Sequence, residues 1–335
     1  MPAEWEPHQG TMLSWPRRNG ISFPGNYDSV MPIFCQMVEA LAYSEKVWIN
    51  VENTAMENEL KGLLPQASLS QVEFLPFPSN EPWCRDHGPL CVTHLDGAKM
   101  GIVNFGFNAW GGKYPPWEND CEIPSRVALR WGLPLFEPKM ILEGGSIDVN
   151  GTGTLITTEA CLLNPNRNPN LSRDEIEQKL RDYLNVAKIL WLGDGIEGDD
   201  TDGHIDDIVR FVNRTTVVTM MESNAADPNH AILQANRELL ATMTIEDGTP
   251  LSIVELPMPE PVVKEDQKLP ASYANFYIAN KVVLLPIFND PKDQGVISTM
   301  KELFPEREII PIVSRELVWG LGAFHCLTQQ IPLVK

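Results

Sequence analysis

Four turn signals recur along the chain, and they constrain its fold more than any other feature of the sequence. Each lies between two apolar runs and therefore predicts a β-hairpin; they are Asp96-Gly97, Asn150-Gly151, Asn213-Arg214 and Asn280-Lys281. Asp-Gly and Asn-Gly tolerate the positive φ of tight hairpin turns, and the other two are weaker versions of the same signal. Successive turns are 54, 63 and 67 residues apart. A unit of about 60 residues would fit five times into this chain.

Amphipathic helices and short apolar strands alternate between the turns. We expect helices at 118–131, 172–184, 229–243 and 293–304, the second opened by the capping box Ser172-x-x-Glu175. The runs that follow them, KMIL, AKILWL, LSIVEL and EIIPIV, are typical of buried strands. The N-terminal unit contributes helices at 31–43 and 54–64 with the strands VWINV and VEFLPF. GTMLSW is then free to complete the last unit and close a ring of five α/β units.

The pattern alone does not separate this ring from an ordinary open α/β sheet. No composition break or Gly/Ser linker divides the chain, so we expect a single domain over residues 1–335.

The charge balance narrows the classes of partner. Lys and Arg total 26 against 45 Asp and Glu, a formal net charge of −19, which disfavours binding to nucleic acids or anionic membranes. No apolar run approaches the roughly 18–20 residues of a membrane span, and the N-terminus lacks a secretory signal, so we expect a cytoplasmic protein. The six cysteines lack CxxC spacing, which indicates neither a disulfide framework nor a zinc ribbon and leaves at least one free to act as a thiol.

The loops between an apolar strand and the next hairpin hold the chemically unusual residues. In a ring of repeated units these loops would converge on one axis, bringing three carboxylates, a histidine and a thiol into one pocket. In chain order the loops are Trp83 to Asp86, Glu143 to Gly145, Gly193 to Asp206, Lys264 to Lys268, and Gly320 to Cys326.

Three of the acids have both a functional and a structural interpretation. Asp86 follows Arg85 and would pair with it if its role were structural. Glu143 ends the KMIL run, where a buried carboxylate is costly unless it is paired; its alternative role is to cap backbone N–H groups. Asp206 lies two residues after His204, so on an extended segment the two side chains would share a face. That pairing favours His204 as an acid/base.

Cys326 follows a glycine-rich loop and His325, which gives a substrate room to approach and offers donors for a thiolate. Its alternative role is that of a small buried hydrophobic residue. Three acids around a thiol would destabilise the oxyanion of a peptidase, but they would hold a planar cation such as guanidinium through its N–H groups. Thiolate attack on the central carbon, loss of ammonia assisted by histidine and hydrolysis of the thiouronium would then follow.

The same residues lie in segments that resemble the agmatine deiminases, a branch of the peptidylarginine-deiminase family and guanidine-modifying enzyme superfamily. The resemblance runs nearly end to end and is carried by MPAEWEPHQGTMLSWP at the start, WCRDHGP at 83–89, FGFNAWGGKY at 105–114, LEGGSIDVNGTGTLITTEACLLNPNRNP at 142–169, DDTDGHIDDIVRF at 199–211, ASYANFYIAN at 271–280 and GAFHCLTQQIP at 322–332. It implies a five-bladed α/β propeller with pseudo-fivefold symmetry. It also implies hydrolysis of agmatine to N-carbamoylputrescine and ammonia without a metal or organic cofactor.

By motif position, the resemblance implies a role for each candidate residue. Cys326 would be the nucleophile, His204 the acid/base, Asp86 and Asp206 the guanidinium ligands, and Glu143 a partner of His204 or of the substrate. Trp83 and Trp110 would line the entrance and the tetramethylene chain, with Asp200 facing the distal ammonium. The family commonly has Gly-Gly-Gly-Asn-Ile-His-Cys at the nucleophile, whereas this chain has Leu321, Ala323 and Phe324 in place of Gly, Asn and Ile.

Free arginine and peptidylarginine are the competing substrates. The stretch 194–207 contains seven acids and no Lys or Arg, which disfavours an anionic tail and favours a dication such as agmatine. A catalytically impaired guanidine or polyamine binder is a second interpretation. A metal-dependent amidohydrolase is a third, although no HxH or HExxH pair is present. A homodimer is compatible with the sequence.

Overall fold

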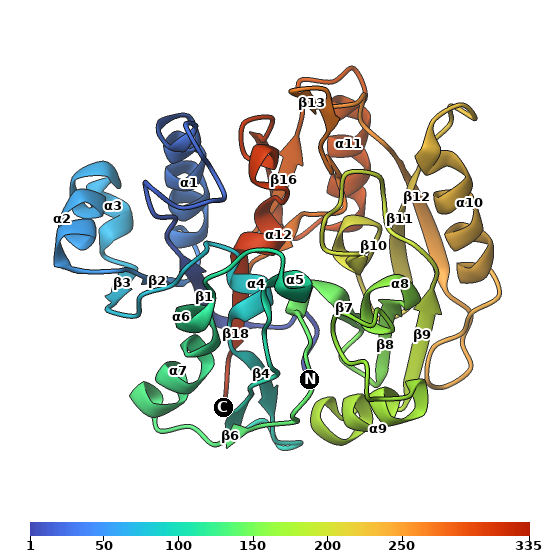
Figure 1. Ribbon diagram of the computed structural model, residues 1–335, viewed down its shortest axis with the longest axis horizontal. Helices are drawn as coiled ribbons and strands as arrows, with labels where there is room; N and C mark the ends of the chain where they lie inside the picture. The colour runs from blue at the N-terminus through green and yellow to red at the C-terminus, as the bar shows by residue number, and fades with distance from the viewer.

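Five small sheets of the same build surround a common centre in the computed structural model, which describes residues 1–335 (Figure 1). In each sheet one strand pairs antiparallel with a central strand, which pairs parallel with the next. Four sheets are built from consecutive strands: β4 (Leu90–Thr93), β5 (Met100–Val103) and β6 (Leu135–Phe136); β7 (Ile147–Val149), β8 (Thr154–Thr158) and β9 (Lys188–Leu192); β10 (Val209–Phe211), β11 (Thr216–Met221) and β12 (Ser252–Pro257); and β15 (Tyr277–Ile278), β16 (Val282–Ile287) and β17 (Glu308–Val313).

The fifth sheet joins the two ends of the chain. Its strand order is β18 (Thr328–Pro332), β1 (His8–Ser14), β2 (Lys46–Asn50) and β3 (Val72–Leu75). The C-terminal β18 takes the antiparallel place that a hairpin strand fills in the other sheets. The expectation that GTMLSW completes the last unit is therefore confirmed, and the open-sheet alternative is excluded.

All four expected hairpins form, although their loops are longer than two residues. The loops span 94–99, 150–153, 212–215 and 279–281. In two of these loops an asparagine side chain binds backbone N–H groups of the turn. Asn150 accepts from the N–H groups of Thr152 and Thr154, and Asn213 accepts from those of Thr215 and Thr216. Such local bonds to the backbone favour a turn over continued strand pairing.

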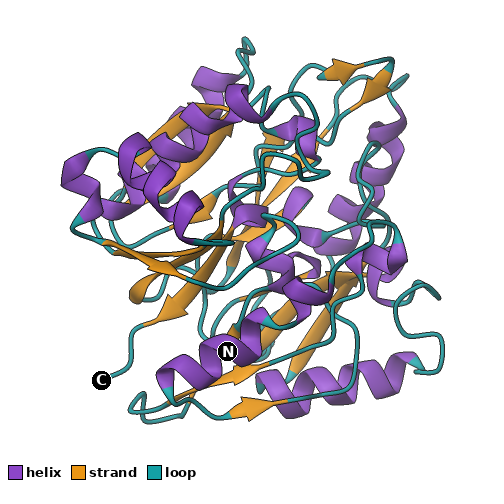
Figure 2. Cartoon of the chain, turned by 60° about the vertical axis from the view of Figure 1, so that its left-hand side comes forward, coloured by secondary structure: helices purple, strands orange, loops and turns teal.

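The longer helices lie outside the strands, whereas the short α4, α5 and α12 lie near the centre (Figures 1 and 2). Ser172 makes the expected capping box with Glu175. The helices are α1 (Tyr27–Ala42), α2 (Thr54–Leu63), α3 (Gln66–Leu69), α4 (Cys84–His87), α5 (Ala109–Gly112), α6 (Glu118–Cys121), α7 (Ile123–Trp131), α8 (Glu159–Leu162), α9 (Arg173–Leu184), α10 (Pro228–Leu240), α11 (Asp293–Leu303) and α12 (Phe324–Leu327). No helix is both long and apolar enough to cross a membrane.

Two expectations within the second unit were wrong. The helix expected at 118–131 is two helices, because Pro124 opens a new helix after Glu122. The KMIL run is not the third strand of its sheet. That place belongs to Leu135 and Phe136, and Ile141 makes only an isolated bridge to Gly106.

A buried carboxylate at the centre ties the units together. Glu4, 4% exposed, accepts from Arg85 at 3.0 Å, Arg210 at 2.9 Å and the backbone N–H of Ile278 at 2.8 Å, and it lies 3.0 Å from His325 Nε2. These four partners come from four different units. Burial opposes the charge, but Arg210, His325 and Arg85 hold the pKa of Glu4 well below its usual range.

Candidate functional site

Five short segments, one from each unit, meet at the centre of the ring. Each carries a residue of the site. They are α4 with Asp86, the 3-10 turn Gly144–Ser146 preceded by Glu143, the 3-10 turn Ile205–Asp207 preceded by His204, the turn 272–275 with Asn275, and α12 with Cys326. Successive segments are in contact, so the expected convergence on one axis is confirmed for four of the five loops named from the sequence.

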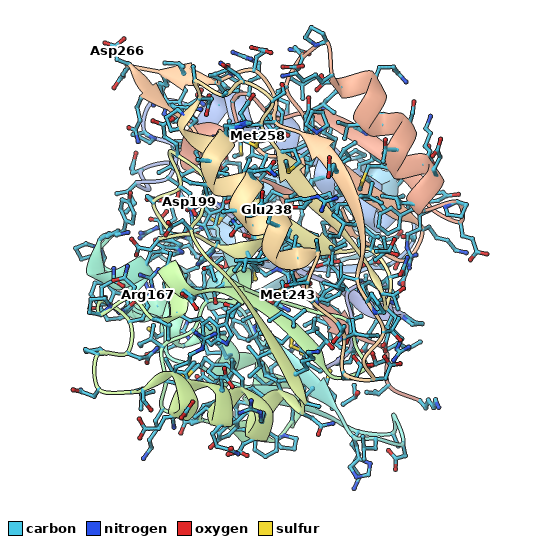
Figure 3. All side chains as sticks on the ribbon, turned by 90° about the vertical axis from the view of Figure 1, so that its right-hand side faces the viewer. Arg167, Asp199, Glu238, Met243, Met258 and Asp266 are labelled. Carbon is cyan, nitrogen blue, oxygen red and sulfur yellow. The ribbon has the colours of Figure 1, made fainter.

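The fourth of these segments differs from the expectation. The sequence analysis placed Lys264 to Lys268 at this position, but that stretch forms the two-stranded hairpin of β13 (Val263–Lys264) and β14 (Gln267–Lys268). Asp266 marks the outer tip of this hairpin in Figure 3. The inner position belongs instead to Ser272–Asn275, which follows it.

Cys326 lies on α12 with its side chain 6% exposed at the bottom of a pocket. Its Sγ accepts a hydrogen bond from Asn275 Nδ2 at 3.0 Å, and the thiol points to Asp206 Oδ2 at 3.6 Å. Burial, and then the charges of Asp206, Asp207 and Asp86, raise the pKa of Cys326 well above its usual value. The thiol is therefore neutral until a positive charge enters the site.

Asn275 holds Cys326 and the turn before it in place, a role that was not expected from the sequence. Its Oδ1 accepts from the backbone N–H groups of Ala323 at 3.1 Å, His325 at 3.1 Å and Cys326 at 3.3 Å, while its Nδ2 also donates to Asp207 at 2.9 Å. The signal available was the repeat itself, because the fourth unit should also supply an inner polar residue.

His204 precedes a 3-10 turn rather than lying on an extended strand, so the argument that i and i+2 side chains share a face was wrong. The turn nevertheless places Nδ1 of His204 3.8 Å from Asp86 Oδ1 and 4.0 Å from Asp206 Oδ1. Burial opposes its charge, yet Asp86, Cys161 and Asp206 raise the pKa of His204 well above its usual value. Neither ring nitrogen has a hydrogen-bond partner.

Asp206 is fully buried and held by a second histidine. His325 Nδ1 lies 2.6 Å from Asp206 Oδ2, and the other side of that ring faces Glu4. Burial opposes ionisation, but the bond and charge of His325 lower the pKa of Asp206. Its other oxygen, Oδ1, has no partner.

Asp86 does not pair with Arg85, whose guanidinium binds Glu4 instead. Asp86 accepts from Trp110 Nε1 at 2.9 Å and from the backbone N–H of Gly145 at 3.0 Å. Burial, followed by the charges of Asp206 and Glu143, raises the pKa of Asp86 although His204 opposes this. The charges of these three carboxyl groups repel one another, which favours binding of a cation beside them.

Glu143 is 0% exposed and is held from behind by Arg167, whose Nε donates to Oε1 at 2.6 Å. Its Oε2 has no hydrogen-bond partner, and one of its carboxylate oxygens lies within 4.8 Å of a ring nitrogen of His204 and of Cys161 Sγ. Glu143 does not cap backbone N–H groups, so the structural alternative fails.

A pocket of about 170 Å³ is lined by two residues of the candidate site, Asp86 and Cys326. Trp83, Trp110 and Asp200 all line it, as does Cys326. Lys264, Tyr114 and Glu81 also line it, and the sequence analysis gave none of them a role. The Asp200 carboxylate accepts the hydroxyl of Tyr114.

The acidic stretch 194–207 is less open to a ligand than its composition indicates. Asp199 accepts three backbone N–H groups of its own loop, and Asp202 pairs with Arg167 at 2.6 Å and Lys113 at 2.8 Å. Figure 3 labels Asp199 and, below it, Arg167 on the same side of the molecule. Of the acids in 194–202, only Asp200 lines the pocket.

The pattern of the Porphyromonas-type peptidyl-arginine deiminases matches residues 1–332 of this sequence. The chain belongs to this family. It is 36% identical to a Selenomonas ruminantium protein provisionally named agmatine deiminase, covering all of this chain and 96% of the relative.

Solved structures of relatives share the fold over the whole length. An agmatine deiminase of Enterococcus faecalis has a TM-score of 0.92 at 32% identity, covering 99% of this chain and 95% of that one. A cysteine-to-serine variant of C. jejuni agmatine deiminase with substrate bound has a TM-score of 0.90 at 29% identity, covering 100% and 96%. A Porphyromonas gingivalis protein provisionally named arginine deiminase has a TM-score of 0.92 at 35% identity, covering 99% and 97%. The α/β fold of this deiminase family is thus confirmed.

The unusual residues before the nucleophile fit the deiminase site without disrupting it. Leu321 has φ 72°, a left-handed conformation that costs a non-glycine residue about 1–2 kcal/mol, and it lines the pocket. The backbone N–H of Ala323 still donates to Asn275, and Phe324 is fully buried. The changes therefore alter the pocket wall but leave Cys326 held.

Two groups of side chains could hold a metal ion in this deiminase. One consists of Glu143, Cys161 and His204, and the other of Asp206, Asp207 and Cys326. Both draw on the residues around the candidate nucleophile. An ion at either group would occupy a thiol or a histidine that the thiolate chemistry needs.

Proposed function

We propose that this protein is an agmatine deiminase that hydrolyses agmatine to N-carbamoylputrescine and ammonia. The observation that carries the proposal is a set of buried polar atoms without partners around a buried thiol. These atoms are Glu143 Oε2, Asp206 Oδ1 and both ring nitrogens of His204. Buried polar atoms are normally satisfied, so a cluster of unsatisfied ones indicates a missing polar ligand.

A guanidinium group supplies what these atoms lack. It is planar and permanently charged, and it presents five N–H donors when carried on an alkyl chain. Asp206 Oδ1 and Glu143 Oε2 would accept from it, and Asp86 would add a third negative charge. Its charge would also stabilise the Cys326 thiolate, because nearby acids are among the causes of that group's raised pKa.

The first half of the reaction forms a covalent intermediate. The charge of the bound cation favours the thiolate, so Cys326 loses its proton to water and the thiolate adds to the guanidinium carbon; the ammonia released later takes up this proton as ammonium. His204, protonated at rest because its pKa is raised, then gives its proton to one NH₂ group of the adduct. Ammonia leaves with the electron pair of the broken C–N bond, leaving a thiouronium on Cys326 and a neutral His204.

The second half regenerates the enzyme. Neutral His204 takes a proton from water as the oxygen adds to the thiouronium carbon. The C–S bond then breaks, and its electron pair returns to sulfur. The hydroxyl proton passes to the sulfur as the C=O forms, giving N-carbamoylputrescine, neutral Cys326 and protonated His204.

The charged groups of the pocket support a dicationic substrate. Its lining includes the carboxyl groups of Glu81, Asp86 and Asp200 but only one ammonium, Lys264. A net charge of −19 also supports a small cation over nucleic acids or anionic membranes as the partner. A homodimer and a cytoplasmic location stay predictions.

Free arginine is the second candidate substrate, because Lys264 offers a positive charge in the pocket wall. Agmatine, arginine and a peptidylarginine should be compared by the carbamoyl product they yield. We expect agmatine to be hydrolysed far faster than the others and activity to survive EDTA. Equal or reversed rates would refute agmatine as the preferred substrate. Binding of agmatine without formation of product would indicate a catalytically impaired binder, and loss of activity with EDTA would favour the metal-dependent alternative.

A further inference from the structure

Glu81 is a buried carboxyl group in the pocket wall with no cationic partner. Glu81 is 4% exposed, lines the pocket and takes part in no ion pair. It accepts a hydrogen bond from Ser22 Oγ, another residue of the wall. A buried acid without a cation costs free energy, so such a group beside a pocket is better explained by a ligand than by the fold.

A second buried acid lies behind Glu81 and increases the negative potential. Asp120 is 0% exposed; its Oδ1 accepts from the backbone N–H groups of Asn80 at 2.6 Å and Glu81 at 3.3 Å, and its Oδ2 has no partner. Asp120 forms no ion pair either, and the nearby Arg17 donates to the carbonyl of Asn80 rather than to a carboxylate. Two backbone N–H groups but no cationic side chain therefore bind the Asp120 carboxyl group.

The indole of Trp83 lies between the Ser22–Glu81 pair and Cys326. One edge of its indole lies against Gly322 and Gly320: a Cβ on Gly322 would lie 2.7 Å from Trp83 Cζ3 and 3.1 Å from Cys326 Cβ. The Nε1 atom of the same ring donates to Ser22 Oγ at 2.9 Å. Ser22 therefore lies at one edge of this indole and Cys326 near the opposite edge, and both line the same pocket as Glu81.

We propose that Glu81, oriented by Ser22, binds the distal primary ammonium of the substrate and so selects diamine-like guanidines. This inference rests on the proposed function and extends it to the outer end of the pocket. Asp200 was the sequence-based choice for this role. Each of the two carboxyl groups accepts a hydroxyl, Asp200 from Tyr114 and Glu81 from Ser22, but Glu81 is the more deeply buried of the two. Lys264, the pocket's own ammonium, lies over the ring of Trp319.

The carboxyl groups of Glu81 and Asp120 should also make the binding of agmatine depend on pH. Burial raises the pKa of Glu81 to about 7; the charge of Asp120 adds to this rise, while the Ser22 hydrogen bond and the charge of Arg17 oppose it. Burial also raises the pKa of Asp120 to about 7. His87, whose ring faces the carbonyl of Glu81, has its pKa lowered to about 4 by burial and is neutral here. Since an ammonium binds only the ionised carboxylate, KM for agmatine should fall as pH rises through about 7.

The test is Glu81→Gln, which keeps the shape of the side chain and its bond from Ser22 but removes the charge. Two substrates are compared: agmatine and n-pentylguanidine, in which a methyl group replaces the ammonium. We expect KM for agmatine to rise at least about tenfold while the preference for agmatine over n-pentylguanidine falls by the same factor. The fall of KM with pH should disappear. Glu118→Gln removes an exposed charge from the same region and serves as the control.

Glu81→Asp keeps the charge and should retain a preference for agmatine, which separates loss of charge from a packing defect. An unchanged preference in Glu81→Gln, or an equal loss for both substrates, would overturn the inference while leaving the proposed function intact. If the unaltered protein does not hydrolyse agmatine, the proposed function itself fails. The two failures are therefore distinguishable.

Discussion

Gly145 occupies the space between the three groups that we place around the guanidinium, so a single methyl group there should stop the reaction. A Cβ on Gly145 would lie 2.6 Å from His204 Nδ1, 2.8 Å from Asp86 Oδ1 and 3.1 Å from Asp206 Oδ2. Gly145 does not have the positive φ that excludes alanine. Gly145→Ala should therefore fold and act only through the space it fills.

The size of the effect follows from these distances. Ordinary contacts of a Cβ begin near 3.4 Å, so His204 and Asp86 must each move by roughly 0.6–0.8 Å, and misplacement of about 1 Å typically costs about 100-fold in rate. We expect kcat/KM for agmatine, measured by ammonia release, to fall by about that factor with an unchanged melting temperature.

Gly295→Ala is the matched control, because a Cβ there meets nothing within 4 Å. It should leave the rate unchanged. Full activity in Gly145→Ala would refute the assignment of His204, Asp86 and Asp206 to one reacting centre. A large loss of stability would show instead that the glycine is needed for folding.

Three further outcomes follow from the site and its supports. Asn275→Ala should lower kcat about 100-fold, because Cys326 loses its hydrogen-bond donor and the acceptor of its backbone N–H. It should also destabilise the fold by about 1–3 kcal/mol, measured by denaturant unfolding. An unaltered kcat would contradict the positioning role. Because burial and the nearby acids raise the pKa of the Cys326 thiol, neutral iodoacetamide should label it slowly at pH 7 and faster as pH rises. A cationic haloacetamidine should react readily at pH 7. Equal labelling rates for the two reagents at pH 7 would contradict this. Glu4→Gln should cost about 3–5 kcal/mol of unfolding free energy at pH 7, because it leaves Arg85 buried without its counter-charge and leaves Arg210 with Asp148 as its remaining carboxylate partner. The pKa of Glu4 is lowered, so this stabilisation is present above the unfolded pKa near 4.5 and is lost as pH falls through the folded value; a difference that persists in strong acid would be inconsistent with it.

The repeated architecture was predictable because turn residues and apolar periodicity report on local structure. The hairpins near Asn150 and Asn213 formed where expected, since an asparagine side chain dictates its own turn. KMIL failed for the opposite reason: an apolar run shows that residues are buried but not which neighbour they pair with. In the structure the pairing falls on Leu135 and Phe136 instead.

The candidate site was predictable to the extent that its residues are chemically unusual. Cys326, His204 and the three carboxylates stand out in the sequence, and the repeat indicates that they converge. Asn275 does not stand out, because an asparagine in a polar loop has many ordinary roles and its value here lies in five long-range contacts.

Ion pairing was the least predictable feature. Arg85 was paired with its neighbour Asp86 in the alternative interpretation, but its partner is Glu4, 81 residues away. Likewise, Arg167 neutralises Glu143 and Asp202 from a segment to which the sequence analysis assigned no charge partner. Such choices depend on tertiary distances, which local patterns do not contain.

The central claim is that Cys326 forms the covalent bond to the substrate. Rapid acid quenching during turnover of agmatine, followed by mass spectrometry of the digested protein, tests it most directly. We predict a single adduct, equal in mass to agmatine less ammonia, on the peptide that contains Cys326, and no adduct in Cys326→Ser. An adduct on another cysteine, or turnover by the serine variant at the original rate, would contradict the mechanism.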